Sequence, residues 1–348
     1  MSTLQSLKPN LDRRQFLGNA VRLGAAIQLG TVMPAKSQLP IEGDLPSFSG
    51  ATGWLNSTPL KSGALRGKVV VVNFWTYTCI NWLRSLPYVR AWAEKYGEQG
   101  LIIVGVHSPE FDFERIPDNV RRAVEEMRVT YPVAMDSNHT VWKAFNNQYW
   151  PALYFADAQG RLRHHRFGEG DYEQSERVIQ QLLAESGVRD GSRDLVAPNA
   201  QGAEVPADWN NLKLPENYLG AARTENRDRT DSVPLKLNHW SASGDWKSRR
   251  DAIVLRKPNG RIAYRFHARD LHLVMGPATP GTNLRFLVRL DGQPPGIAHG
   301  IDVDTHGNGT VTAQRLYQLI RQSGPIVDRL FEVEFMEPDV EVFSFTFG

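Results

Sequence analysis

The sequence predicts an α/β domain followed by an all-β sandwich of the jelly-roll type. Two continuous apolar runs, 69–75 and 101–107, are each followed by a helical pattern, which is typical of strands buried on both faces of a parallel sheet. The stretch 188–215 is rich in Gly, Asp, Asn, Pro and Ala and has no periodicity, which indicates a linker. Beyond it, alternating apolar and polar stretches recur at intervals of roughly 8–12 residues, as in the strands of a sandwich.

The α/β domain is expected to alternate strands and helices and to end in a hairpin and a helix. The expected elements are strands at 69–75 and 101–107, helices at 80–96 and 117–127, a hairpin of 152–155 with 161–167, and a last helix that includes 178–183. Pro87 lies inside the first of these helices and predicts a kink. This order of elements predicts a sheet with parallel strands and an antiparallel end.

The first 36 residues predict a twin-arginine export signal. Arg13 and Arg14 precede a weakly apolar run rich in Gly and Ala, a combination that resembles twin-arginine signals. The alternative is an amphipathic helix of a cytoplasmic protein. The expected location is therefore periplasmic or extracellular. The expected organisation is a signal at 1–36, an α/β domain at 37–187, a linker at 188–215 and a β-sandwich at 216–348.

The composition excludes several kinds of site and partner. The chain has 348 residues with 40 basic and 38 acidic side chains, and this small surplus does not indicate a nucleic acid as partner. The single cysteine, Cys79, excludes an internal disulfide, a cysteine-rich zinc site and a dithiol cycle within one chain. No stretch approaches the ~20 apolar residues that span a bilayer. We therefore expect no membrane span in the mature chain, and we expect neither a metal nor a cofactor.

Cys79 lies a few residues after a predicted buried strand and directly before a predicted helix. At a helix N-terminus the free N–H groups and the helix dipole stabilise a thiolate, so we expect a lowered thiol pKa and a reactive sulfur. The alternative is an inert thiol that fills space in the core. The reactivity of the thiol distinguishes these two interpretations.

The region around Cys79 resembles the active-site segment of exported thioredoxin-like proteins of the redoxin (TlpA) type, in particular the soluble C-terminal part of DipZ-type proteins. The similar segments are 73–83, 105–111, 147–152, 167–170 and 345–348. The resemblance implies a thioredoxin-like fold for the α/β domain and a C-terminal domain similar to carbohydrate-binding modules. It also implies that Pro151 is cis and lies against the active cysteine, where backbone groups stay free to pair with an extended polypeptide.

Two positions depart from the pattern of that family. The family motif is Cys-x-x-Cys, and Trp82 stands where the second cysteine belongs. That second thiol normally resolves the mixed disulfide that the first thiol forms. Asn73 stands where thioredoxins hold a buried Asp that assists the second thiol. Dithiol reductase chemistry is therefore excluded.

Three functions remain open for Cys79. The first is monothiol chemistry, in which the cysteine forms a sulfenic acid or a mixed disulfide; its partner is a thiol- or disulfide-containing protein or a small thiol. The second is a peroxidase, because Thr76 stands three residues before the cysteine as in peroxiredoxins, although Val72 stands where those proteins have Pro. The third is a redox-inactive protein that binds a peptide or a carbohydrate.

Parallel strands bring their C-terminal ends to one edge of a sheet, where ligands collect. Cys79 follows the first such strand, His107 ends the second, and Trp150-Pro151 opens an antiparallel strand at the same edge. His107 is a candidate base for the thiol, with a histidine bonded to backbone as the alternative. Glu110 and Trp150 are candidate ligand-binding residues at this edge.

The aromatic residues of the β region have two interpretations. Trp240 and Trp246 lie in or before its strands, together with Tyr264 and Trp209. Exposed aromatic rings on such sandwiches stack on sugar rings, which makes a glycan a candidate partner of this region. The alternative is that they are core residues, as alternating aromatics in strands usually are.

Overall fold

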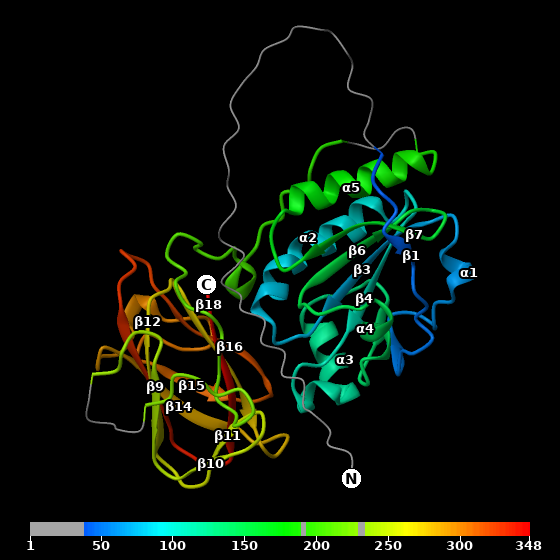
Figure 1. Cartoon of the computed structure of the whole chain (residues 1–348). Coiled ribbons are helices and arrows are strands. Elements are labelled where there is room, and N and C mark those ends of the chain that lie inside the picture. Colours follow the sequence, from blue (N-terminus) through cyan, green and yellow to red (C-terminus); the bar gives the residue numbers. More distant parts are fainter. Residues whose placement is uncertain (1–37, 189–192, 229–233) are drawn as a thin grey trace, which may run out of the picture. The chain divides into compact units, whose positions relative to one another are not determined.

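The computed structural model describes residues 38–188, 193–228 and 234–348. The predicted export signal with Arg13 and Arg14 lies outside the described residues. Leu39–Gly348 form one compact unit, which contains an α/β region and a β region (Figure 1). No helix in the described part of the chain is both long and apolar enough to cross a membrane. The domain and linker boundaries expected from the sequence remain a prediction.

The α/β region is built on a seven-stranded sheet with the order β1-β7-β6-β3-β4-β5-β2. β3 is parallel to β4 and β4 to β5, whereas β6 and β7 form an antiparallel hairpin beside β3. The predicted sheet with parallel strands and an antiparallel end is confirmed. The strands are β1 (Gly43–Asp44), β2 (Gly53–Leu55), β3 (Val69–Trp75), β4 (Leu101–His107), β5 (Val133–Met135), β6 (Ala152–Ala156) and β7 (Arg161–Phe167). The helices are α1 (Ser62–Leu65), α2 (Ile80–Tyr96), α3 (Pro117–Glu126), α4 (Thr140–Ala144) and α5 (Tyr172–Glu185).

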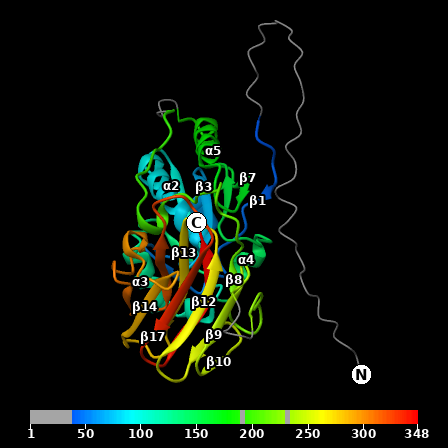
Figure 2. The same ribbon diagram turned by 90° about the vertical axis from the view of Figure 1, so that its left-hand side faces the viewer.

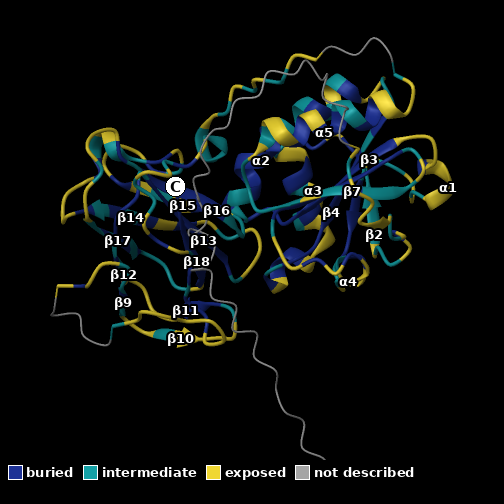
Figure 3. Cartoon of the chain, turned by 45° about the horizontal axis from the view of Figure 1, so that its top comes forward, coloured by how far each residue is buried: buried dark blue, intermediate teal, exposed yellow. Residues whose placement is uncertain are grey.

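Helices cover both faces of this sheet. Residues of α2, α3 and α5 form one core with Val69 and Val71 of β3. Residues of α1 and α4 form another core with Val70, Val72 and Phe74 of the same strand. Figure 3 shows β3 and β4 in the colour of buried residues, while the outer side of α5 is exposed. A strand covered on both faces has to be apolar throughout, which is why the sequence signal was so clear.

The β region consists of two antiparallel sheets around a core of their own. One sheet has the order β10-β11-β18-β13-β16 with β8 beside β18, and the other has the order β15-β14-β17-β12-β9. In Figure 2, β14, β17, β12 and β9 lie side by side. Burial alternates along β12 and β14, as expected for strands with one face in a core, and the predicted all-β sandwich is confirmed. The strands are β8 (Asn217–Tyr218), β9 (Trp240–Ser243), β10 (Trp246–Ser248), β11 (Ile253–Leu255), β12 (Gly260–Phe266), β13 (Asp270–Pro277), β14 (Leu284–Leu290), β15 (Asn308–Val311), β16 (Arg315–Arg321), β17 (Arg329–Phe335) and β18 (Val340–Phe347).

The last strand of the β region is buried on both faces. All eight residues of β18 are buried, because one face belongs to the core of the sandwich and the other packs on the α/β region. Phe343 lies against Phe111 and Phe113, with ring centroids 5.2 and 4.7 Å apart. Arg84 of α2 donates a hydrogen bond of 2.7 Å to the carbonyl of Phe347. The β region is therefore in close contact with the helix that follows Cys79.

Candidate functional site

Cys79 is the N-cap residue of α2. Its N–H donates to the carbonyl of Thr76 at 3.2 Å, and its own carbonyl accepts the N–H of Leu83 at 3.0 Å. Cys79 is partly buried, and its sulfur lies 3.9 Å from the carbonyl oxygen of Trp150. The Trp150–Pro151 peptide is cis, as the resemblance implied. The expected succession of strand, loop, cysteine and helix is confirmed.

Trp82 and Asn73, the two departures from the dithiol pattern, contact each other. The indole N–H of Trp82 donates a hydrogen bond of 2.9 Å to Oδ1 of Asn73, and both side chains are fully buried. The indole also stacks on Trp75, with ring centroids 4.2 Å apart and planes 21° apart. A tryptophan therefore fills the place of the second thiol, and its N–H uses the oxygen that stands where thioredoxins have a carboxylate. The two replacements form one matched pair.

Glu114 connects the cysteine loop to the loop after β4. This fully buried carboxylate accepts hydrogen bonds from the hydroxyl of Thr78 (2.6 Å) and from the N–H groups of Glu110 (2.7 Å) and Phe111 (2.9 Å). Burial raises the pKa of Glu114, although the hydrogen bonds oppose this shift. Thr76 is fully buried beside the same carboxylate, so its hydroxyl is not exposed to a peroxide that enters from solvent. The spacing of four residues between Glu110 and Glu114 was the available sequence signal for this contact.

Glu110 belongs to a cluster of charged and polar groups beside Cys79. Its Oε1 atom accepts hydrogen bonds from the phenol of Tyr218 (2.6 Å) and from Nη1 of Arg223 (2.7 Å). The phenol is also 2.8 Å from Oε2 of Glu216, and the guanidinium of Arg223 lies over the Tyr218 ring at 3.6 Å. Sequence reasoning missed Tyr218, Glu216 and Arg223, since no local pattern relates them to a cysteine so far away in the chain.

The pKa of the Cys79 thiol is raised, whereas a lowered pKa was expected. Removal of water raises its pKa well above the usual value, and the carboxylates of Glu216 and Glu110 raise it further. The backbone N–H groups of Trp82 and Asn81 at the start of the helix lower it, which is the expected effect of a helix N-terminus, but they are outweighed. The prediction of a lowered thiol pKa is therefore wrong, because the helix is only one of the groups that face the sulfur.

His107 is buried between two aromatic rings. Its ring lies edge-on to Trp75 at 4.7 Å and is stacked on Tyr77 at 5.6 Å, measured between ring centroids. Burial lowers the pKa of His107 to about 3, so this imidazole is neutral at pH 7 and is a poor base for a thiol. Its contacts are those of a structural histidine packed among aromatic rings, and the expected role as a base is not supported.

The other residues expected at this edge are present there. Trp150 donates its indole N–H to the carbonyl of Ser108 at 2.9 Å and packs on Trp142 at 4.3 Å between ring centroids. Its ring therefore holds the loop that carries Pro151. In the described residues, no group of three or more His, Cys, Asp or Glu side chains is arranged to hold a metal ion.

The aromatic residues of the β region are mostly core residues. Trp240 and Tyr264 are fully buried, and the indole N–H of Trp240 donates to the carbonyl of Glu225 at 2.9 Å. Trp246 is partly buried and packs edge-on to Phe335 at 6.0 Å. Trp240 therefore cannot stack on a sugar ring, and this part of the glycan prediction is wrong. Trp240 lies in the core of the sandwich.

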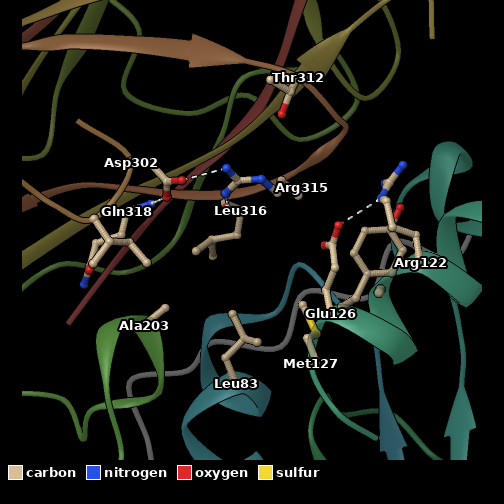
Figure 4. Close-up of a pocket in the computed structure, with 13 residues that line it drawn as sticks. Leu83, Arg122, Glu126, Met127, Ala203, Asp302, Thr312, Arg315, Leu316 and Gln318 are labelled. Carbon is tan, nitrogen blue, oxygen red and sulfur yellow. Dashed lines mark hydrogen bonds and ion pairs between the residues drawn. The ribbon is translucent and has the colours of Figure 1, made fainter. Parts of the chain in front are cut away.

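A pocket of about 410 Å³ lies beside α2 and α3 (Figure 4). Leu83, Met127 and Leu316 supply apolar surface, as the sticks in Figure 4 show. Its charged groups pair with each other: Arg315 with Asp302 at 2.6 Å, and Arg122 with Glu126 at 3.9 Å. Because these ion pairs are satisfied within the pocket, the geometry gives no reason to assign a ligand to it.

Two family models match the chain. Residues 41–165 match the AhpC/TSA family, and residues 214–348 match a family described as thioredoxin like C-terminal domain. Protein DipZ of Mycobacterium tuberculosis is 33% identical over 318 residues, which cover 87% of this chain and 42% of that protein. The chain thus spans less than half the length of this relative.

Two shorter proteins are similar to the α/β region. Thiol-disulfide oxidoreductase YkuV of Bacillus subtilis is 30% identical over 141 residues, which cover 40% of this chain and 95% of that protein. A solved structure of a thioredoxin-like protein in the oxidized form is 30% identical, with a TM-score of 0.38, and covers 41% of this chain and 96% of that one. The similar proteins include a thiol-disulfide oxidoreductase. The chain therefore belongs to the thioredoxin-like redoxin family and also carries the thioredoxin-like C-terminal domain.

Proposed function

We propose that this chain is an exported thiol oxidoreductase of the redoxin type that works with a single thiol. One observation carries the proposal: Cys79 is the N-cap residue of α2 with its sulfur beside the carbonyl of the cis Trp150–Pro151 peptide, while the place of a second thiol is filled by Trp82, which is bonded to Asn73. A sulfur in this position can attack a disulfide. Nothing in the chain can then resolve the product, because the sequence has one cysteine.

The proposed chemistry is thiol-disulfide exchange with an outside partner. The sulfur of Cys79 attacks a disulfide RS–SR′, the new bond is Cys79–S–SR, and R′S⁻ leaves and takes up the thiol proton as R′SH. A thiol from solution or from another protein later attacks the mixed disulfide and restores Cys79. The partner class is a protein or small molecule with a reactive disulfide or thiol, in a periplasmic or extracellular space. The arginine pair Arg13–Arg14 supports the export part of the proposal.

Trapping tests the proposed exchange. The full chain is incubated with 4,4′-dithiodipyridine or oxidised glutathione, and the mass of the peptide that contains Cys79 is measured. We expect a mixed disulfide that persists until dithiothreitol is added, no adduct in Cys79→Ser, and no reduction of insulin. Absence of any adduct on the wild-type sulfur at pH 8 would rule out exchange at this site.

A second candidate is a binding protein without thiol chemistry. The raised pKa of Cys79 favours it, since a neutral thiol is a weak nucleophile. The ligand would be an extended peptide that pairs with backbone groups next to Pro151. In that case Cys79→Ser and the wild type bind such a peptide equally well, and no covalent adduct forms. A sugar ligand has lost the support of Trp240 and Tyr264, which are buried.

A further inference from the structure

The side chain of Glu114 joins two segments that are far apart in the sequence. Glu114 belongs to a short 3₁₀ helix, η2 (Asp112–Arg115), in the loop after β4. One of its oxygens accepts the hydroxyl of Thr78 at 2.6 Å, and the other accepts two backbone N–H groups of its own loop at 2.7 and 2.9 Å. Thr78 directly precedes Cys79. Glu114 therefore connects the segment that carries the thiol to the segment that follows β4.

This connection is costly to break. Glu114 is fully buried and Thr78 is 2% exposed, so neither side chain can replace its partner by bulk water. A buried carboxyl group depends on its hydrogen bonds to compensate for the water it has lost. Movement of Thr78 would leave one of these oxygens without its donor, and an unmade hydrogen bond in the interior is unfavourable. The hydroxyl of Thr78 therefore holds the cysteine segment against η2.

Phe113, the residue before Glu114, makes a second connection that is apolar. Its ring lies 6.0 Å from the ring of Tyr77 and 4.7 Å from the ring of Phe343 in β18, measured between centroids. All three rings are buried. Two consecutive residues of η2 thus contact the two residues that precede Cys79, and on its other side η2 packs on the β region.

We infer that η2 couples the β region to the thiol, with Glu114 and Phe113 as the positioning residues that keep Cys79 partly buried. A change in the packing of β18 on η2 would then change how far the sulfur is exposed. In this inference the C-terminal region regulates the thiol through η2, whatever else it binds. The inference deepens the proposed function, and its importance for exchange rests on that function.

Loss of the connection should make the thiol more reactive. Removal of water is the main cause of the raised pKa of Cys79, so a sulfur that becomes more exposed should ionise more readily. Thr78→Val keeps the branched shape of the side chain and removes the hydroxyl, whereas Thr78→Ser keeps the hydroxyl and removes a methyl group. If the hydroxyl positions the thiol, only the valine variant should release it. If Thr78 merely fills space, the serine variant should have the larger effect.

The experiment measures the rate at which iodoacetamide alkylates Cys79 in the full chain at pH 8. We expect Thr78→Val to react at least about tenfold faster than the wild type, and Thr78→Ser to react at close to the wild-type rate. Glu114→Gln is a second variant of the same contact. It should also react faster, because its amide N–H₂ group would face N–H donors that need an acceptor. Circular dichroism at pH 8 checks that each variant is folded.

Phe343→Leu tests the connection to the β region. It removes the ring that packs on η2 without changing any charge, and it should also accelerate alkylation. Phe286→Leu is the matched control, because Phe286 is buried in the core of the β region and packs on Phe335 at 6.2 Å between ring centroids; it should leave the rate unchanged. In the double variant Thr78→Val/Phe343→Leu the acceleration should be less than the product of the two single effects, since both act through η2.

Several outcomes would overturn the inference. They are a wild-type rate in Thr78→Val, an equal acceleration in Thr78→Ser, equal rates in Phe343→Leu and Phe286→Leu, or independent effects in the double variant. Alkylation needs no disulfide partner, so it separates this inference from the proposed function. The expected rates without any mixed disulfide would leave the inference standing and remove the function, and mixed disulfides with a wild-type rate in Thr78→Val would do the reverse.

Discussion

Replacing Trp82 by Cys puts a second thiol where the family motif has one. Cys79 is the N-cap residue of α2 and Trp82 is the third residue of that helix, so residue 82 lies on the first turn, on nearly the same face as the cysteine. A thiol there should reach Cys79, form an internal disulfide under mild oxidation and give some reduction of insulin-like disulfides. Adding Asn73→Asp supplies the missing carboxylate and should raise this activity further.

The stability changes can be worked out from the structure. Trp82 is fully buried and stacked on Trp75, and truncation of such a side chain costs about 3–5 kcal/mol in the free energy of unfolding. The stranded Oδ1 of Asn73 adds a cost of about 1 kcal/mol or more. An internal disulfide between residues 79 and 82 closes a loop of only a few residues, and it should offset about 2 kcal/mol of this loss in the free energy of unfolding. Oxidised Trp82→Cys should therefore be more stable than its reduced form by about 2 kcal/mol, and less stable than the wild type.

Denaturant unfolding of the oxidised and reduced protein measures this difference, and mass spectrometry after thiol labelling reports the disulfide. Trp82→Ala is the matched control: it leaves a similar cavity, and its stability should not depend on redox state. A folded Trp82→Cys protein that forms no disulfide, or whose stability is the same in both redox states, would show that residue 82 does not face the sulfur. The reasoning about the paired replacement would then be refuted.

Three further predictions concern acid, charge and export. Burial lowers the pKa values of His107 and His272 to about 3. Between that value and about 6.5, these histidines bind protons in the unfolded state but not in the folded state, so the free energy of unfolding should fall by about 2–3 kcal/mol per histidine from pH 7 to pH 4.5. Urea unfolding that shows no such pH dependence would contradict this prediction. The carboxylates beside Cys79 should make the cationic disulfide cystamine react faster than an anionic disulfide of similar size, with a difference that shrinks at high salt; equal rates at low salt would contradict it. Changing Arg13 and Arg14 to Lys should leave unprocessed protein in the cytoplasm, and normal export of that variant, measured by cell fractionation, would exclude the twin-arginine assignment.

The fold and the position of the thiol could be predicted because their signals are local. The apolar runs at 69–75 and 101–107 became β3 and β4, since a strand covered on both faces has to be apolar throughout. Cys79 was expected at a helix start and is the N-cap residue of α2. Asn73 and Trp82 were each recognised as departures from the family motif, although only the structure joins them by a hydrogen bond.

The remainder of the site depends on contacts that no local pattern encodes. The N-terminus of α2 does lower the pKa of the thiol, as the local pattern predicted. Burial and the charges of Glu110 and Glu216 outweigh it, and these depend on the tertiary structure. Tyr218 reaches Glu110 only because β8 pairs with β18. Trp240 shows the same limit, since strand alternation reveals two faces but does not tell which face is covered.

A thiol with this environment suits retention of a partner better than rapid turnover. Burial, together with its carboxylate neighbours, keeps the resting sulfur protonated, which slows attack on any disulfide that meets it by chance. Once a mixed disulfide forms, the sulfur of Cys79 carries no charge, so the nearby carboxylates do not destabilise it as they destabilise the thiolate. Trp82 occupies the position from which a second thiol would release the partner, and it is hydrogen-bonded to Asn73, which stands in the place of the assisting carboxylate. If Cys79 exchanges as proposed, its surroundings therefore slow both the formation and the reduction of the mixed disulfide. Release of the partner then depends on a thiol that the partner or the compartment provides.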